Sequence, residues 1–186
     1  GQGVMSAGGN VAVTAGGDIR QLSVSLPTTW KADPDGQGVT TYGGGHLDVR
    51  AGGDILSGSY FVAKGQGSIE AGGAIGADFG FTAASSSGPY AGLSTPVSTL
   101  FALQDAQLDV RARAGADIGG VYNPSYVLAD ASSGSDIASV LPAGRTDAQG
   151  YSAASSFQAV SVAGNVVFDS LSLPGVLFDY GAADVA

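Results

Sequence analysis

The chain has 186 residues, of which 31 are glycine and 12% are charged, with a formal net charge of -9 and no cysteine. Glycine at more than twice its usual share disfavours a helical enzyme, because each glycine in a helix interior costs about 1 kcal/mol. Seven Lys and Arg residues against 16 Asp and Glu residues argue against a nucleic-acid partner, which needs clustered cations, and the lack of cysteine excludes disulfides and thiolate zinc sites.

The first element in chain order is a short alternating strand that ends in two glycines. In the segment VAVTAGGDI, alternation places Val11, Val13 and Ala15 on one buried face. The glycine pair at 16–17 predicts a tight turn with positive φ. Asp18 is expected to cap this turn by accepting hydrogen bonds from local backbone amides.

This pattern of strand, glycine corner and isoleucine returns along the chain. The further copies are Leu47–Ile55, Gly67–Ile75, Val110–Ile118 and, more weakly, Val160–Val166. Their predicted buried residues are Leu47, Val49 and Ala51, then Ile69 and Ala71, then Val110, Ala112 and Ala114. Their predicted solvent-facing residues are Asp48, Arg50, Glu70, Arg111 and Arg113.

Repetition of one corner predicts an all-β, right-handed parallel β-helix (β-solenoid) with loop insertions. The corner isoleucines are 36, 20 and 43 residues apart, which we interpret as two short turns, one turn, and two turns with an insertion. Eight or nine turns stacked about 4.8 Å apart would form a rod of roughly 40 Å. A β-sandwich is the alternative, although it has no reason to repeat one corner.

Three segments between the copies are predicted to be insertions, at approximately 25–45, 82–106 and 122–156. They are rich in Ser, Ala, Gly and Pro, and a short helical turn is expected at 135–141. Loops of this kind usually carry binding, so any recognition is expected there. We expect residues 1–186 to be one solenoid segment of a longer chain, with no membrane span and no signal peptide in it.

Few residues in the sequence match a catalytic or ligand-binding motif. His46 has no second histidine or cysteine near it in sequence and is expected to be a surface imidazole. Asp33-Pro34-Asp35-Gly36 resembles the start of a calcium loop but lacks its downstream ligands, so a turn is expected, with adventitious calcium as the alternative. The corner acids Asp18, Asp54 and Asp117 would stack along one edge, either as an acidic ladder or, as we favour, as turn caps.

No nucleophile elbow, zinc-protease, phosphate-loop or dinucleotide motif occurs, and no pair of acids is selected by spacing. We therefore expect no enzyme activity, no catalytic residue, no cofactor and no metal site. Nine aromatic residues lie in or beside the insertions, where they are expected to cover the core or seal its ends: Trp30, Tyr42, Tyr60, Phe61, Tyr90, Phe101, Tyr122, Tyr126 and Tyr151.

The lines NVAVTAGGDI, HLDVRAGGDI and SIEAGGAIG resemble the shaft of filamentous haemagglutinin-like exoproteins of two-partner secretion, as does YSAASSFQAVSVAGNVVF. The resemblance implies a right-handed parallel β-helix that an outer-membrane two-partner secretion transporter exports to the cell surface. The family's secretion domain carries an Asn-Pro-Asn motif, whereas the nearest string here is Asn123-Pro124-Ser125, so this segment is not that domain. No toxin domain is recognisable.

The expected function is therefore a structural segment of a secreted bacterial cell-surface filamentous adhesin or effector-delivery stalk. Its partners would be the secretion transporter during export and a receptor or glycan on a host or neighbouring cell, with no nucleic acid. The alternative is a β-helix protein that binds or cleaves polysaccharide, in which acids and a basic residue gather on one lateral face.

Overall fold

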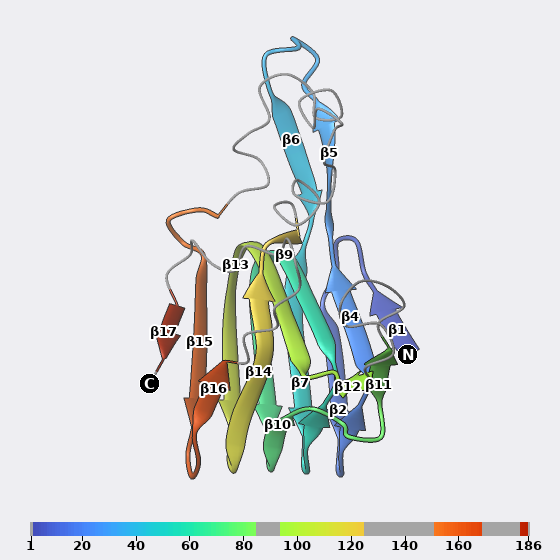
Figure 1. Cartoon of the computed structure of the whole chain (residues 1–186). Helices are drawn as coiled ribbons and strands as arrows, with labels where there is room; N and C mark the ends of the chain where they lie inside the picture. The colour runs from blue at the N-terminus through green and yellow to red at the C-terminus, as the bar shows by residue number, and fades with distance from the viewer. Residues whose placement is uncertain (1, 85–93, 125–150, 169–182, 186) are drawn as a thin grey trace.

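The computed structural model describes residues 2–84, 94–124, 151–168 and 183–185. These ranges contain 17 β-strands. Thirteen strands form one sheet in which all pairs are parallel, and this sheet curls into a half-barrel (Figure 1). Two antiparallel hairpins complete the structure. The all-β prediction is confirmed, and the fold is dominated by parallel pairing.

The strands have the following bounds: β1 Gln2–Met5, β2 Val11–Ala15, β3 Ile19–Arg20, β4 Leu22–Leu26, β5 Thr28–Ala32, β6 Val39–Gly43, β7 Gly45–Ala51, β8 Ile55–Leu56, β9 Ser59–Ala71, β10 Ala74–Gly76, β11 Thr82–Ala84, β12 Ser94–Pro96, β13 Thr99–Ala112, β14 Gly115–Tyr122, β15 Ser156–Ser161, β16 Val166–Phe168 and β17 Ala183–Val185.

The parallel sheet consists of three ladders that the chain visits in turn. Ladder A runs β1-β4-β9-β13-β14. Ladder B runs β2-β7-β9-β13-β15-β17. Ladder C runs β3-β8-β10-β14-β16. The long strands β9 and β13 cross from ladder A to ladder B without a break, so the two ladders share one continuous surface.

Each repeat of the sequence is one step along a ladder. Val13 pairs with Val49, Val49 pairs with Ile69, and Ile69 pairs with Val110, at separations of 36, 20 and 41 residues. Our interpretation of the longer gaps as two turns is wrong, because the extra residues leave the sheet. Ladder B has six strands, which at about 4.8 Å per strand span about 24 Å rather than 40 Å.

The fourth copy of the repeat is displaced by two residues from the alignment that the sequence suggested. Ala116, and not Ile118, pairs with Ile75 at the corner. Ala114, which was expected to be buried, is exposed. A slip of two residues leaves every side chain on the same face of a strand, so alternation alone could not detect it.

In the weak fifth copy the strand is offset by one residue from the strands of the other copies, whereas Val166 takes the corner position, paired with Ala116. Phe157 and Ala159 are buried, whereas Val162 is 80% exposed. The cause is the pairing of Ala159 with Val110, which puts this alanine over a core valine. A one-residue change of register moves each side chain to the opposite face of the strand, and the short strand gave too few alternations to select the correct one.

The buried side chains of the three ladders form one hydrophobic core. In β2, Val11, Val13 and Ala15 pack on the core while the intervening side chains face solvent, as alternation predicted. The same positions in β7 are almost fully buried, with Leu47 2% and Val49 0% exposed. The first repeat is therefore less covered than the second.

An aromatic column runs through the core across three repeats. Tyr60 and Phe101 stack with ring centroids 5.8 Å apart, and Phe157 follows at 5.4 Å from Phe101. Tyr60 and Phe101 are fully buried. These two residues are thus interior core residues rather than covers of insertions, because in-register pairing places like positions on one another.

The insertions are narrower than the composition suggested. Leu26 in β4 is fully buried and Gly45 already begins β7, so only residues 28–43 leave the sheet, as the β5–β6 hairpin. Residues 99–106 belong to β13 and not to the second insertion, since Phe101 and Leu103 lie in the core. The helical turn expected at 135–141 lies outside the described residues.

The corner glycines are needed for a different reason from the one expected. None of the glycines at 16–17, 52–53 and 72–73 has positive φ. Instead, a Cβ on Gly52 would collide with the carbonyl oxygen of Gly16, and a Cβ on Gly72 would collide with that of Gly52. A Cβ on Gly16 would meet nothing within 4 Å. Close stacking of one corner on the previous one therefore selects glycine.

Replacement of Gly52 should separate this cause from a general preference for flexible corners. We expect Gly52→Ala to lower the free energy of unfolding by about 1–3 kcal/mol, because backbone must move to admit the methyl group. Gly16→Ala should change it by less than about 0.5 kcal/mol. Urea unfolding of both variants tests this, and equal losses would contradict the stacking argument.

The hydroxyl of Tyr60 is buried and has no hydrogen-bond partner within the described residues. Burial correspondingly raises the pKa of this phenol. Tyr60→Phe keeps the stacked ring and removes the unsatisfied group, so the free energy of unfolding should stay equal or rise by about 1 kcal/mol. Thermal or urea unfolding measures this, and a loss above about 1 kcal/mol would show that the hydroxyl has a favourable partner.

Candidate functional site

The corner aspartates connect successive repeats. Asp18 Oδ1 accepts a hydrogen bond from the backbone N–H of Asp54 at 2.9 Å, and Asp54 Oδ1 accepts one from Ala74 N–H at 2.7 Å. The expectation of local turn capping is therefore wrong, since both bonds cross to the next repeat. Asp117 does not join this column, because its position pairs with Val167 beyond the corner.

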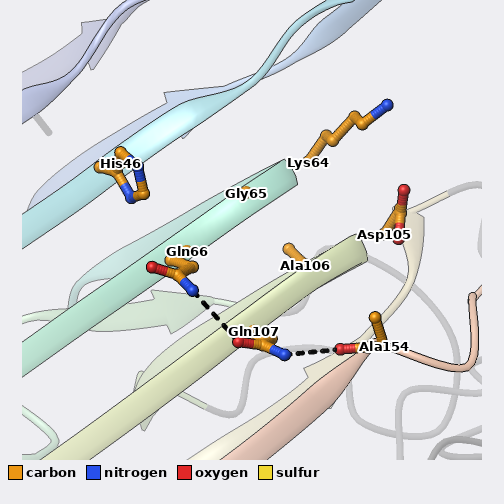
Figure 2. A pocket seen from close by; sticks show the side chains of 8 residues that line it. All are labelled: His46, Lys64, Gly65, Gln66, Asp105, Ala106, Gln107 and Ala154. Carbon is orange, nitrogen blue, oxygen red and sulfur yellow. Dashed lines mark hydrogen bonds between the residues drawn. The ribbon is translucent and has the colours of Figure 1, made fainter.

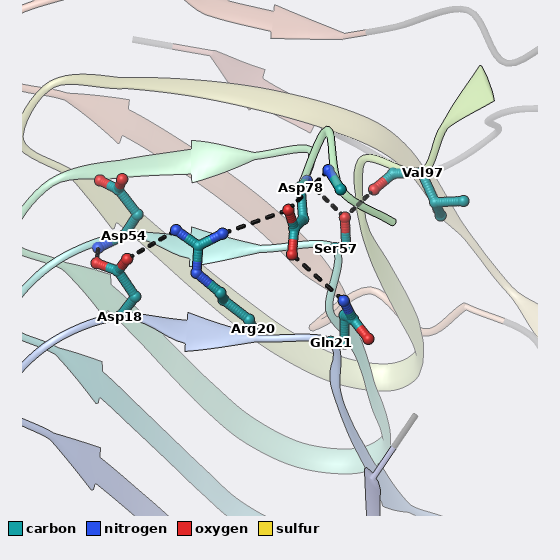
Figure 3. A network of polar contacts seen from close by, with 8 residues as sticks. Asp18, Arg20, Gln21, Asp54, Ser57, Asp78 and Val97 are labelled. Carbon is teal, nitrogen blue, oxygen red and sulfur yellow. Dashed lines mark hydrogen bonds and ion pairs between the residues drawn. The ribbon is translucent and has the colours of Figure 1, made fainter. Parts of the chain in front are cut away.

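Beside this column, Arg20 connects the corner to the segment that follows β10 (Figure 3). Its guanidinium lies 3.0 Å from Asp18 Oδ2 and 3.3 Å from Asp78 Oδ1. Gln21 donates to the second oxygen of Asp78 at 3.3 Å. Arg20 is half exposed and Asp78 is nearly buried, so the network lies at the surface beside ladder C.

Ser57 holds both ends of the insertion between β10 and β13 (Figure 3). Its hydroxyl accepts from Asp78 N–H at 2.6 Å and donates to the carbonyl of Val97. Ser57 also has a positive φ of 53°, which is uncommon for a residue other than glycine. Asp18, Arg20, Gln21, Ser57 and Asp78 together form a polar joint that ties this insertion to the sheet.

Hydrogen bonds to the carboxylates of Asp78 and Asp18 favour the charged form of both groups. The N–H of Gly80, the Gln21 amide and the Arg20 guanidinium hold the pKa of Asp78 below its usual range. The N–H of Asp54, with Arg20, likewise lowers the pKa of Asp18. Both groups are therefore stabilised as anions, which is suited to structural ion pairing and not to proton transfer near neutral pH.

A shallow groove of about 390 Å³ lies on the outer surface where ladders A and B meet (Figure 2). Its lining residues come from β7, β9, β13 and the segment before β15: His46, Lys64, Gly65, Gln66, Asp105, Ala106, Gln107 and Ala154. Figure 2 shows His46, Gln66 and Gln107 in a line across three neighbouring strands, with Lys64 and Asp105 beside them.

The groove has polar rims and a small-residue floor. In-register pairing places His46 beside Gln66 and Gln66 beside Gln107. Gln66 Nε2 donates to Gln107 Oε1 at 3.3 Å, and Gln107 Nε2 donates to the carbonyl of Ala154 at 3.2 Å. Gly65 and its paired Ala106 separate the rims, and their lack of large side chains leaves the surface hollow.

The remaining residues singled out from the sequence do not assemble into a site. Asp33 and Asp35 accept hydrogen bonds from Thr40 Oγ1 and Gln37 N–H in the turn of the β5–β6 hairpin. No group of three His, Cys, Asp or Glu residues that would hold a metal ion occurs within the described ranges. His46 is exposed at the groove, as predicted for a surface imidazole.

The other aromatic residues are spread over the molecule. Tyr42 on the hairpin is 53% exposed, and Trp30 lies opposite Thr41 in the same hairpin. Phe61, Tyr122 and Tyr151 are half-buried. Tyr90 and Tyr126 lie outside the described residues.

Sequence reasoning missed the glutamines and the Lys64–Asp105 pair of the groove. Gln66 and Gln107 are 41 residues apart and become neighbours only through the pairing of β9 with β13. The available signal was the polar residue directly before a copy of the repeat, a position that His46 and Gln66 share. Without the correct register of the fourth copy, this signal did not extend to Gln107.

Comparisons with known proteins leave the chain without an assigned relative. No family model, no curated protein and no solved structure matches it. Among the described residues, none lies in a helix with the length and apolar character needed to span a membrane.

Acid should weaken the Arg20–Asp78 joint. Because the folded-state pKa of Asp78 is lowered, its contribution is complete above the unfolded pKa of about 4 and is lost as pH falls through the folded value. We expect the melting temperature to fall below about pH 4, and Asp78→Asn to melt lower at pH 7 with a shallower acid dependence. Thermal unfolding from pH 7 to 2 measures this.

Asp109 offers the matched control, since it is an exposed carboxylate on the outer face of β13. Asp109→Asn should retain the melting temperature and the acid dependence of the original chain. If Asp78→Asn retained both as well, the joint would contribute nothing to the stability of the fold.

Proposed function

We propose that the chain is a structural segment of a secreted bacterial surface protein of the filamentous haemagglutinin type, an adhesin or an effector-delivery stalk, with no catalysis of its own. In this proposal the three ladders are the sides of a right-handed parallel β-helix. The observation that carries it is the in-register repeat, in which Val13, Val49, Ile69 and Val110 follow one another along ladder B.

The physical logic is that of a repeat protein. Each repeat contacts only its neighbours, so added repeats extend the molecule and do not enlarge a globular core. Insertions then leave the shaft at intervals, as the β5–β6 hairpin leaves the parallel sheet (Figure 1). Such a segment becomes longer with each added repeat and presents variable surfaces along its length.

The edge formed by the first repeat supports further stacking. Val4 and Met5 are 41% and 75% exposed there, and Val11 and Val13 are only half-buried. A Cβ on Gly16 or Gly17 would meet nothing within 4 Å. At Gly52 and Gly53, the equivalent positions of the next repeat, glycine is required because a Cβ would collide with the preceding corner. One more repeat on this edge would cover these valines and explain both glycines.

The corner column indicates which residues would suit a further repeat stacked on this edge. Asp54 N–H donates to Asp18 Oδ1, while Asp18 N–H has no acceptor within the described residues. A Cβ on Gly53 would collide with the carboxylate of Asp18 in the preceding repeat. The equivalent position one repeat after Ala74, which has no carboxylate, is occupied by Ala114. Gly17 therefore fits beneath a corner with Asp or Asn, as in this chain's own repeats.

Export and location belong to the same proposal. A shaft of this type would pass an outer-membrane two-partner secretion transporter and act at the bacterial cell surface or in secreted form. A receptor or glycan on a host or neighbouring cell would be its partner. The support is the resemblance of the repeats to this class and the lack of cysteine, which suits passage through an oxidising periplasm.

A polysaccharide-binding β-helix is the second candidate, and the outer groove favours it. Cleavage is less well supported than binding, because glycoside hydrolysis uses two carboxyl groups flanking the bond, and Asp105 is the one carboxylate among the described residues that line the groove. A binding function would also be compatible with a shaft, since the groove lies on the outer surface of the ladders.

An added repeat tests the structural proposal. A copy of residues 57–76, in which the corner carries A74D, is fused ahead of Gln2. We expect a higher melting temperature and new hydrogen-exchange protection at the amides of 16–18, because the copy covers the open valines and supplies the carboxylate acceptor. The same fusion with Ala74 retained is the control and should be less stable by about 0.5–1.5 kcal/mol.

The fusion experiment can also contradict the shaft proposal. If the fused repeat neither raised the melting temperature nor slowed exchange at 16–18, the edge would not accept a further repeat of this kind. The shaft proposal would then lose its physical basis.

A further inference from the structure

The outer groove at the junction of ladders A and B has a composition that selects a class of ligand. Its rims present two amides, an imidazole, an ammonium group and a carboxylate, and none of the described residues that line it has a large apolar side chain. Apolar ligands would find nothing to cover their surface in such a site. The groove is instead built to exchange hydrogen bonds.

The amides retain hydrogen-bonding capacity. Gln66 and Gln107 each use one N–H, toward Gln107 Oε1 and the carbonyl of Ala154. A side-chain amide has two N–H donors, so each keeps one for a ligand. Gln66 Oε1 has no donor within the described residues. The rim therefore presents both donors and acceptors side by side.

The charges in the groove compensate each other. Lys64 lies opposite Asp105 in the pairing of β9 with β13, and the Asp105 carboxylate also accepts from Ser152. A polyphosphate or polyanionic chain needs several clustered cations, whereas Lys64 is the one lysine among the described lining residues and lies beside Asp105. The chain's net charge of -9 adds to this repulsion. An uncharged ligand is favoured.

A peptide strand does not fit the site. Peptides that add to a sheet require a strand edge with free backbone groups. Strands β7, β9 and β13 each have a parallel neighbour on both sides, so the groove lies over the interior of the sheet. Recognition must come from side chains alone.

We propose that this groove binds a neutral, linear oligosaccharide that lies across the strands. Sugar hydroxyls donate and accept hydrogen bonds, which matches the mixed rim of His46, Gln66 and Gln107. These side chains repeat with the strand spacing of about 4.8 Å, so a ligand with hydroxyls at regular intervals meets equivalent groups along its length. This inference rests on the second candidate function, polysaccharide binding, for which it names the site and the ligand class, and its test does not depend on the stacking of repeats.

The test uses the chain as it stands, with three neutral hexasaccharides (cellohexaose, xylohexaose and maltohexaose) and the acidic hexamer of galacturonic acid. Nuclear magnetic resonance titration follows the side-chain amide signals of glutamine, together with the backbone amide signals of Gly65 and Ala106, which line the groove and are retained in every variant. We expect at least one neutral sugar to shift the signals of Gln66 and Gln107 with a dissociation constant near or below about 1 mM. The acidic hexamer should bind more weakly than that sugar.

Variants assign the binding to the groove. The double change Gln66→Ala with Gln107→Ala should weaken binding at least about tenfold, since two hydrogen-bonding side chains are removed. Gln158→Ala is the matched control, because Gln158 is exposed on the outer face of β15 opposite Asp109 and outside the groove. It should bind as the original chain does. Both sites are exposed, so melting temperatures should be unchanged and verify folding.

Three results would each overturn the proposal: no shift with any neutral hexasaccharide, equal binding by the double variant, or tighter binding of the acidic hexamer. None of them affects the stacking test of the shaft, because that test depends on the first repeat and not on the groove.

Discussion

In-register parallel stacking is the constraint on which the remainder of this structure depends. Successive repeats lie about 4.8 Å apart, so each residue sits on its equivalent in the repeat before it. Within the core this stacks apolar groups, as in the column Tyr60, Phe101 and Phe157. At the corner it brings backbone so close that Gly52 and Gly72 have no room for a Cβ. The same spacing lets Asp18 accept from the next repeat.

A sheet built this way tolerates extra residues only where they can leave it. The hairpin at 28–43 departs between ladders A and B, and the segment after β10 departs beyond ladder C. The second departure is held by Arg20, Ser57 and Asp78, whose bonds fix where the chain leaves and returns. The insertions are thus attached to the stack without altering its spacing.

The outer surface follows from the same stacking. Residues of one ladder position form columns, so Gln66 and Gln107 become neighbours although 41 residues separate them. Between the polar columns, Gly65 and Ala106 leave a hollow. The sequence contains each of these residues, but their assembly depends on pairing between distant strands, which alternation cannot specify. For this reason the groove could not be predicted, whereas His46 as an exposed imidazole could.

By itself the sequence determined the all-β class, the repeating corner and the facing of the first three copies, because alternation and glycine spacing are local properties of a strand. Tertiary structure decided the register, since a two-residue slip in the fourth copy leaves the pattern of faces intact. It also decided that Asp18 bonds across repeats and that Asp117 lies outside the corner column. Those contacts join residues that only stacking brings together.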